Sequence, residues 1–235
     1  MKLQDLLTII IPCKSDQYEI LTCLRYLYNQ NNIDGVRIIL MDSSTKILSP
    51  HLLKHSVIKY KDKLNIDIIK NRKNKSNARL IASELCKTEY LLFLEADTCI
   101  TDEKLLTTLL TSKHQKSLTT TTLVADNPME WMYSILYPFQ KILNFLNAPY
   151  ASSNFQLWKT SAYWEAGGYN PYYNLADDFA LTKNVNPTNF RIHKTKSVWV
   201  SGHILQKKGH WYLFKLLCLA YLNRKNPKFF KKYKI

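Results

Sequence analysis

Glycine is scarce in this sequence, and its scarcity excludes two kinds of nucleotide-binding loop. The 235 residues contain five glycines, and none of them falls in a G-x-G-x-x-G or a G-x-x-x-x-G-K-[ST] pattern. The chain therefore lacks the glycine-rich loops with which dinucleotide-binding Rossmann proteins and P-loop NTPases hold phosphates. A nucleotide bound to this protein must be held by other residues.

Paired cysteines and long apolar runs are also missing. The five cysteines are odd in number and show no C-x-x-C spacing, which argues against a zinc site and against a disulfide framework. We therefore expect a reducing, cytoplasmic compartment. No uninterrupted apolar stretch reaches the roughly 20 residues that span a bilayer, so we expect a soluble or peripherally bound protein.

Acidic residues are absent from the last quarter of the chain. Residues 1–178 contain 20 Lys and Arg against 18 Asp and Glu, whereas residues 179–235 contain 13 Lys and Arg and no acid. A basic end of this kind implies a polyanionic neighbour, which can be a nucleic acid, an anionic membrane surface or a phosphorylated substrate. The chain has no recognisable nucleic-acid-binding module, so nucleic acid is the less favoured partner.

Residues 211–235 form a basic segment of mixed aromatic and apolar character. The apolar stretch 211–222 is too short to span a membrane, but it can lie in the membrane interface. For residues 223–235 we favour contact with an anionic membrane at its inner, cytoplasmic face. In that arrangement the aromatic residues lie at the level of the lipid headgroups, namely Trp211, Phe229, Phe230 and Tyr233. The alternative is a core helix followed by a frayed tail.

Strand and helix patterns alternate along the first hundred residues. Apolar runs that predict buried strands are Leu7–Pro12, Val36–Met41, Ile66–Lys70 and Tyr90–Leu94. Helical spacing of apolar residues lies between them, over residues 17–31, 50–60 and 77–87. This alternation predicts an α/β fold with a mostly parallel central sheet flanked by helices. The alternation then stops, so we expect the second half to be a mixed elaboration on the same sheet, in one domain.

Ligands of such sheets bind where the parallel strands end, so the residues that follow the strands are candidates. The first strand ends at Pro12-Cys13-Lys14, the second at Asp42 and the fourth at Glu95-Ala96-Asp97. Glu95 and Asp97 lie on either side of Ala96, so both carboxylates can turn toward one point. Two such carboxylates suit a hard divalent cation such as Mn²⁺ or Mg²⁺. The alternative is a solvated turn after the strand.

Several segments, taken in order, resemble the motifs of family 2 glycosyltransferases. They are Ile9–Lys14, Arg37–Thr45, Lys75–Arg79, Phe93–Asp97, Ser152–Asn170 and Asp177–Leu181. The resemblance implies a GT-A (Rossmann-like) fold that binds a nucleotide-diphosphate sugar and transfers the sugar with inversion. It implies a GT-A domain over residues 1–210, with a nucleotide-sugar half at 1–110 and an acceptor half at 111–210, followed by the basic segment 211–235.

The resemblance also implies a donor site, with a UDP-sugar as the expected donor. Its expected residues are Pro12, Cys13, Lys14, Asp42, Lys75, Arg79, Glu95, Ala96 and Asp97. Asp97 is the strongest candidate metal ligand, and Glu95 stands where the family's D-x-D motif has its first aspartate. His203 matches the position of a third ligand. For Asp42 the alternative is an Asx turn that involves Ser44 and Thr45.

Inverting transfer needs one base that takes the proton of the acceptor hydroxyl, and a carboxylate suffices for this step. The resemblance places that base at Asp178, with Asp177 beside it. Adjacent carboxylates repel each other, which raises one pKa if they are partly buried. The alternative is a pair of ordinary acids in the first turn of a helix.

The acceptor side of the cleft is expected at Asn154, Gln156 and Trp158, although aromatic residues in an apolar segment often belong to the core. The expected acceptor is a glycan or a lipid-linked molecule. Two other functions stay open: a protein that binds nucleic acid or an anionic membrane through its basic end, and a nucleotide-sugar-binding protein that has lost catalysis.

Overall fold

Four parallel strands form one half of the central sheet in the computed structural model. The model describes residues 2–14, 17–44, 49–71, 73–113, 115–125, 130–201 and 211–231. The strands are β1 (Leu7–Cys13), β2 (Arg37–Asp42), β3 (Asn65–Lys70) and β4 (Tyr90–Leu94). The helices between them are α1 (Gln17–Tyr28), α2 (Ser49–Val57) and α3 (Lys75–Glu84), with short 3₁₀ turns at Leu3–Asp5 and Ile58–Tyr60. The alternation predicted for the first hundred residues is confirmed.

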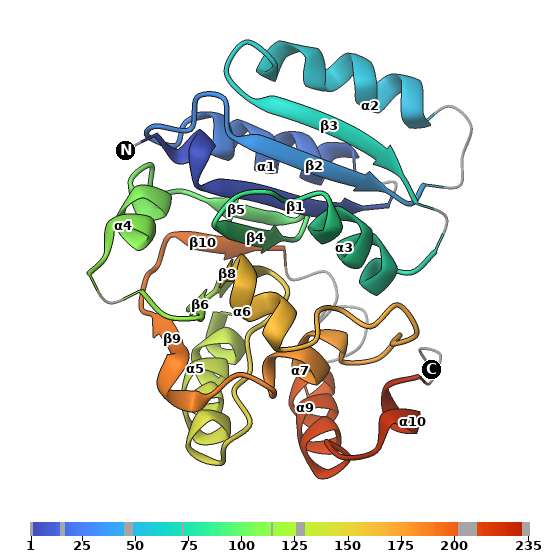
Figure 1. Ribbon diagram of the computed structural model, residues 1–235, viewed down its shortest axis with the longest axis vertical. Coiled ribbons are helices and arrows are strands. Elements are labelled where there is room, and N and C mark those ends of the chain that lie inside the picture. Colours follow the sequence, from blue (N-terminus) through green and yellow to red (C-terminus); the bar gives the residue numbers. More distant parts are fainter. Residues whose placement is uncertain are drawn as a thin grey trace.

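The second half of the chain extends the same sheet with strands of both directions. These strands are β6 (Leu118–Thr121), β8 (Phe155–Lys159) and β9 (Phe190–His193). β8 pairs antiparallel with β4 and with β6, and β9 pairs parallel with β6. The complete order is β3-β2-β1-β4-β8-β6-β9 (Figure 1). The prediction of a mostly parallel sheet with a mixed second half is therefore confirmed.

A small second sheet lies beside the end of β4. It consists of β5 (Thr98–Ile100), β10 (Val198–Val200) and β7 (Val124–Ala125), in the order β5-β10-β7. β5 follows β4 after three residues, and β10 pairs antiparallel with it. This pairing brings Ser201, at the end of β10, to Asp97, because the Ser201 N–H donates to the Asp97 carbonyl at 3.2 Å.

Most helices of the second half lie on the side of the sheet away from α2, whereas α4 (Leu105–Thr111) lies beside β5 and the end of α1 (Figure 1). The others are α5 (Glu130–Phe145), α6 (Thr160–Glu165), α7 (Asp177–Thr182), α9 (Tyr212–Leu222) and α10 (Pro227–Phe230), with a 3₁₀ turn at Pro187–Asn189. α5 and α9 pack through their aromatic rings, for Phe139 and Phe214 lie 5.1 Å apart. None of the described helices combines the length and the apolar composition that crossing a bilayer requires.

The central sheet is buried on both faces, which explains its uninterrupted apolar runs. In β1, Ile9 and Ile11 belong to the cluster that also contains residues of α1. Ile10 points to the other face, where it meets Ala78 and Ala82 of α3. Because neighbouring side chains of a strand face opposite sides, a strand covered by helices on both sides needs apolar residues at every position.

The C-terminal residues 227–230 dock onto the protein. The N–H groups of Asn174 and Leu175 donate to the Phe230 carbonyl at 2.9 and 3.2 Å, and the side chains of Phe229 and Phe230 are buried. The prediction that these two phenylalanines lie at the headgroups is therefore wrong, because they complete the core beside Tyr173. Trp211 is exposed, and Tyr233 lies outside the described residues.

Candidate active site

Glu95, the residue after β4, is held by two cations of α3. The Lys75 ammonium donates to Glu95 Oε2 at 2.6 Å, and the Arg79 guanidinium donates to Glu95 Oε1. The helix begins at Lys75 because the Asn74 side chain caps it by accepting from the Asn77 N–H. Residues four apart lie on one face of a helix, so Lys75 and Arg79 reach the same carboxylate.

Arg79 also joins Glu95 to the first turn of α7. Its guanidinium donates to Asp177 Oδ2 at 2.7 Å and lies 4.9 Å from the centre of the Tyr169 ring. The Ser76 hydroxyl donates to the same Asp177 oxygen. Because the Arg79 side chain is 2% exposed, both carboxylates are needed to balance a buried charge.

These contacts determine the charge of Glu95. Burial by itself raises the pKa of Glu95, but the charges of Lys75 and Arg79 outweigh burial and lower this pKa to about 2. Glu95 is therefore an anion at any physiological pH. Its charge, together with burial, in turn raises the pKa of Asp97 above its ordinary value.

Asp178 has a different environment from its neighbour Asp177. Its carboxylate accepts from the Tyr150 hydroxyl at 3.2 Å and from the Ser153 N–H at 3.4 Å. The Ser153 side chain also helps to lower the pKa of Glu95, so Ser153 influences both carboxylates. Burial and the adjacent charge of Asp177 raise the pKa of Asp178 to about 6, which is suitable for a general base.

The turn before α7 is strained. Ala176 has φ 46° and ψ 41°, the left-handed region, and its side chain gives no cap to the helix. This conformation costs a residue with a β-carbon about 1–2 kcal/mol, and such strain concentrates at functional sites. The left-handed conformation of Ala176 directly precedes α7, which begins at Asp177. Asp177 and Asp178 therefore both lie in the first turn of a helix, which was the alternative interpretation of this pair.

Asp97 is the described residue best suited to hold a divalent metal ion. Its carboxylate accepts from the Ser201 hydroxyl at 2.8 Å. Glu95 is engaged by Lys75 and Arg79, and no group of three His, Cys, Asp or Glu among the described residues has the arrangement of a metal centre. His203 lies outside these residues. One carboxylate fits Mn²⁺ or Mg²⁺ that takes its other ligands from water and substrate phosphates.

The other predicted donor residues lie at the ends of β1 and β2. Cys13 pairs in register with Asp42, Pro12, Cys13 and Ala96 are buried, and Lys14 is exposed. The buried Asp42 carboxylate accepts from the Ser44 N–H at 2.8 Å and from Lys70. This contact to Ser44 is the Asx turn expected as the alternative, and Thr45 lies outside the described residues.

Two of the three predicted acceptor residues are core residues. The side chains of Gln156 and Trp158 are fully buried, and Gln156 Oε1 accepts from Trp158 Nε1 and from the Tyr169 hydroxyl. Both therefore lack the exposed surface that direct acceptor contact needs, and that prediction is wrong. Asn154 is half-buried and donates to the Thr98 hydroxyl at 3.1 Å.

A pocket of about 440 Å³ opens between α7 and the C-terminal residues, with Asp177 in its lining. Three basic side chains line it, namely Lys183, Arg224 and Lys225. Burial and the charge of Arg224 lower the pKa of Lys183, which shows that the two cations repel each other. None of the three takes part in an ion pair among the described residues.

Sequence reasoning missed four residues that contact the acids: Ser76, Tyr150, Ser153 and Ser201. Ser76 and Ser153 stand inside the Lys75–Arg79 and Ser152–Asn170 segments, so their positions were a usable signal. Tyr150 and Ser201 lie outside every motif segment. Their contacts connect residues far apart in the chain, and Asp97 and Ser201 are separated by 104 positions.

Known proteins match this arrangement. The family model described as "Glycosyl transferase family 2" matches residues 8–172. Among solved structures, the mannosyltransferase PcManGT from Pyrobaculum calidifontis, in complex with GDP-Man and Mn²⁺, has a TM-score of 0.67 at 16% identity, over 97% of this chain and 65% of that one. S. aureus TarS in complex with UDP-GlcNAc has a TM-score of 0.62 at 15% identity, over 83% of this chain and 58% of that one.

A third solved structure is glucosyl-3-phosphoglycerate synthase from Mycobacterium tuberculosis, with a TM-score of 0.57 at 11% identity, over 93% of this chain and 79% of that one. Curated proteins gave no match. The fold is thus a GT-A fold, and because the family model covers most of the chain, the protein belongs to glycosyl transferase family 2. Its length is about two thirds of the mannosyltransferase chain.

Replacing Glu95 by Gln is expected to lower the free energy of unfolding at pH 7 by about 3 kcal/mol or more, since Arg79 and Lys75 lose their shared anion. A carboxyl whose folded pKa is depressed stabilises the fold above its unfolded pKa, and this contribution disappears as the pH falls toward 2. Between pH 7 and pH 3, urea unfolding should therefore show a smaller decrease in the free energy of unfolding for Glu95→Gln than for wild type. An equal decrease in both proteins contradicts this, as does equal stability at pH 7 of Glu95→Gln and the exposed control Glu84→Gln.

Replacing Gln156 by Leu is expected to lower the free energy of unfolding by roughly 2–5 kcal/mol, because Trp158 Nε1 and the Tyr169 hydroxyl lose their acceptor. The reason is that buried donors without a partner keep their full desolvation penalty. Urea unfolding of the variant measures the change. A variant within about 0.5 kcal/mol of wild type would show that Gln156 has no structural role.

Proposed function

We propose that this protein transfers a sugar from a nucleotide-diphosphate sugar, with a UDP-sugar as donor, to a hydroxyl of a glycan or lipid-linked acceptor, with inversion. The observation that carries the proposal is that the carboxylates near Arg79 have pKa values shifted in opposite directions. The charges of Lys75 and Arg79 lower the pKa of Glu95 to about 2, whereas burial and the charge of Asp177 raise the pKa of Asp178 to about 6. Carboxylates whose pKa values are pushed apart take different roles in one reaction.

Asp178 acts as the general base. Its carboxylate accepts the proton of the acceptor hydroxyl while the hydroxyl oxygen attacks C1 of the sugar from the face opposite the nucleotide. The new C–O bond forms as the bond from C1 to the diphosphate oxygen breaks, and the diphosphate leaves with the electron pair. Tyr150 and the Ser153 N–H hold the Asp178 carboxylate in place.

Asp97 holds the divalent metal ion, and Ser201 orients the Asp97 carboxylate. When bound, Mn²⁺ or Mg²⁺ neutralises the charge that develops on the departing diphosphate. Two solved structures of similar fold support this choice, because the mannosyltransferase structure contains GDP-Man and Mn²⁺ and the GalNAc-T7 structure contains UDP, GalNAc and Mn²⁺. Lys75 is exposed enough to move from Glu95 toward the donor phosphates.

The pocket between α7 and the C-terminal residues receives an anionic group of the acceptor. Lys183, Arg224 and Lys225 supply positive charge there, and Asp177 in the lining places the pocket next to the base. Cationic side chains bind phosphate groups by charge-assisted hydrogen bonds. A lipid-linked acceptor, which carries phosphate between lipid and sugar, has the chemistry that this pocket selects.

Replacing Asp178 by Asn is expected to lower the rate of sugar transfer by about 10²–10⁴-fold, because no other group takes the proton. The wild-type kcat/KM should rise with pH through about 6, since Asp178 must lose its proton to act as the base. Nucleotide release from the donor measures both, with the exposed acid Asp34→Asn as control. A rate that is flat between pH 5 and 8, or unchanged in Asp178→Asn, removes Asp178 from the mechanism.

Thermal unfolding with UDP-, GDP- and dTDP-sugars, each with and without Mn²⁺, tests donor and metal together. We expect the largest rise in Tm with a UDP-sugar plus Mn²⁺, because a ligand that binds only the folded state stabilises it, by about 2.7 kcal/mol at 100 times its Kd. Asp97→Ala should lose the part that depends on Mn²⁺, while the exposed control Glu103→Ala keeps it.

Thermal unfolding, combined with assays of nucleotide release and of DNA binding, distinguishes the two alternative functions. Binding of the nucleotide sugar without nucleotide release, in wild type, would identify a nucleotide-sugar-binding protein that has lost catalysis. A salt-dependent shift of DNA together with no response to any nucleotide sugar would favour a nucleic-acid-binding protein.

A further inference from the structure

Large apolar side chains are exposed along one face of α5 and one face of α9. On α5 they follow helical spacing, and on α9 they begin one residue before the helix. We call this set the apolar end: Trp131, Ile135, Ile142 and Phe145 of α5 with Leu146 after it, and Phe214, Leu219 and Leu222 of α9 with Trp211 before it. Phe145 is 85% exposed and Leu222 is 74% exposed.

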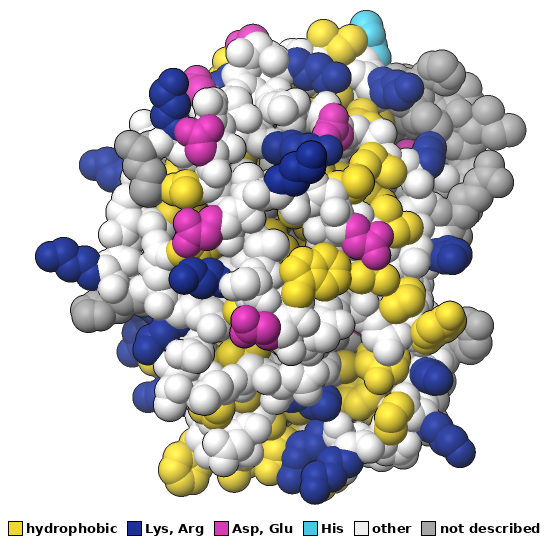
Figure 2. Space-filling view, viewed as in Figure 1, with side chains coloured by type: hydrophobic (Ala, Val, Ile, Leu, Met, Phe, Trp, Pro, Cys, Tyr) yellow, Lys and Arg dark blue, Asp and Glu magenta, His cyan; other side chains and the backbone are white. Residues whose placement is uncertain are grey.

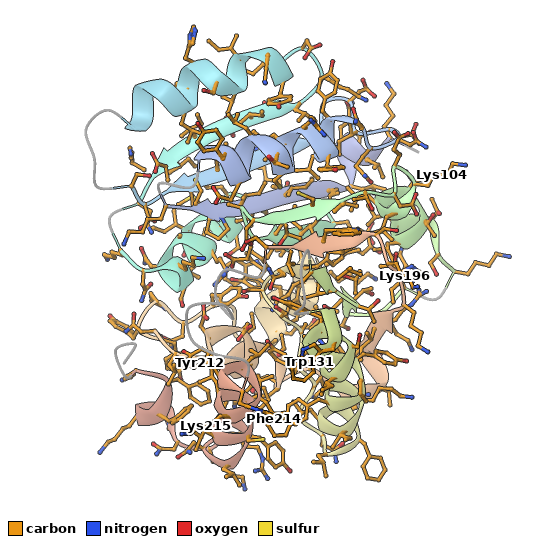
Figure 3. The ribbon with its side chains drawn as sticks, turned by 180° about the vertical axis from the view of Figure 1, so that it is seen from behind. Lys104, Trp131, Lys196, Tyr212, Phe214 and Lys215 are labelled. Atoms are coloured by element: carbon orange, nitrogen blue, oxygen red, sulfur yellow. The ribbon has the colours of Figure 1, made fainter. Side chains whose placement is uncertain are left out.

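The two helical faces form one continuous surface. Trp131 and Trp211 lie 6.3 Å apart, and Trp211 and Phe214 lie 6.2 Å apart. Figure 3 shows Trp131 and Phe214 on neighbouring helices, with Lys215 close by. Both helices run toward the end of the molecule opposite α2, so their carboxyl ends, with Phe145 and Leu222, share that end (Figure 1).

Basic side chains surround the apolar end. Lys141, Lys215 and Lys228 are exposed on α5, α9 and α10. α5 begins with an acid, Glu130, but α9 and α10 contain none. The next acids along the sequence are Glu165, Asp177 and Asp178, which lie outside these three helices. On the face in Figure 2, the described side chains of this lower end are hydrophobic and basic, with no acid visible there.

We propose that the apolar end is a docking surface for an anionic lipid bilayer, with the side chains of α5 and α9 in the acyl boundary and the lysines at the lipid phosphates. Exposed apolar side chains with a basic rim are what an interfacial membrane surface requires. The surface differs from the one expected from sequence, because Phe229 and Phe230 are buried in the protein and α5 supplies half of the contact.

The charge of the surface favours a bilayer over a second copy of this chain. Two copies joined through the apolar end would place lysines against lysines, and like charges across an interface cost free energy. An anionic bilayer instead offers the opposite charge. Docking there also orients the enzyme, because α7, which carries Asp178, packs against α9.

Flotation of the full chain with vesicles tests the proposal. We expect binding to vesicles of equal parts phosphatidylcholine and phosphatidylglycerol, and much weaker binding to phosphatidylcholine alone. The double variant Phe145→Ser, Leu222→Ser should lose about tenfold or more in partition, because two large apolar side chains leave the bilayer. The matched control Ile58→Ser removes an apolar side chain that is 59% exposed far from this surface, and it should bind like wild type.

The charge variants form a second pair. Lys215→Glu, Lys228→Glu should lower partition into anionic vesicles by about tenfold or more, because each lysine near the surface contributes about 1 kcal/mol. The control Lys54→Glu, Lys61→Glu changes the same charge on α2 and the turn after it, and it should leave binding unchanged.

Three results would overturn the proposal. They are no flotation of wild type with anionic vesicles, equal binding by Phe145→Ser, Leu222→Ser and wild type, or a wild-type dimer that this variant dissociates in size-exclusion chromatography with light scattering. Nucleotide release without vesicles is measured in parallel. It reports on sugar transfer alone, so failure of membrane docking and failure of the proposed function are distinguishable.

Discussion

The buried guanidinium of Arg79 is the contact on which the whole site depends. It binds Glu95 after β4 and Asp177 in the first turn of α7, and so connects the parallel half of the sheet to the second half of the chain. A buried cation requires anions at fixed positions, so both carboxylates are held beside the guanidinium. Burial and the charge of Glu95 raise the pKa of Asp97, and burial and the charge of Asp177 raise the pKa of Asp178.

The glutamate at position 95, where the family's D-x-D motif has aspartate, has a physical explanation in this arrangement. Its carboxylate reaches two cations of α3, Lys75 and Arg79, at once. Asp97, two residues later, belongs to a different element and contacts Ser201 after β10. The two acids of the motif therefore have different surroundings: Glu95 balances charge inside the protein, and Asp97 is the acid proposed to hold the metal ion.

Sequence patterns predicted β1 and β4 because both faces of each are covered, so the runs Leu7–Pro12 and Tyr90–Leu94 are almost entirely apolar. β8 could not be found in this way, since Gln156 lies inside it and its place between β4 and β6 depends on tertiary pairing. The acids of the site could be located because they follow strands or match a motif. Their partner Tyr150 could not, because its position depends on how α7 packs. Phe229 and Phe230 were misplaced because lysines beside aromatic residues are also the pattern of an interfacial segment.

The basic residues of the last quarter divide between two adjacent places. Arg224 and Lys225 line the pocket beside Asp177, while Lys215 and Lys228 lie at the rim of the apolar end. The pocket and the rim of the apolar end are close in sequence, because α9 (Tyr212–Leu222), α10 (Pro227–Phe230) and the turn between them supply the basic residues of both. An acceptor anchored in a bilayer under the apolar end would thus present its phosphate to the pocket and its hydroxyl to Asp178. An acid on α9 or α10 would repel the same phosphate, and neither helix contains one.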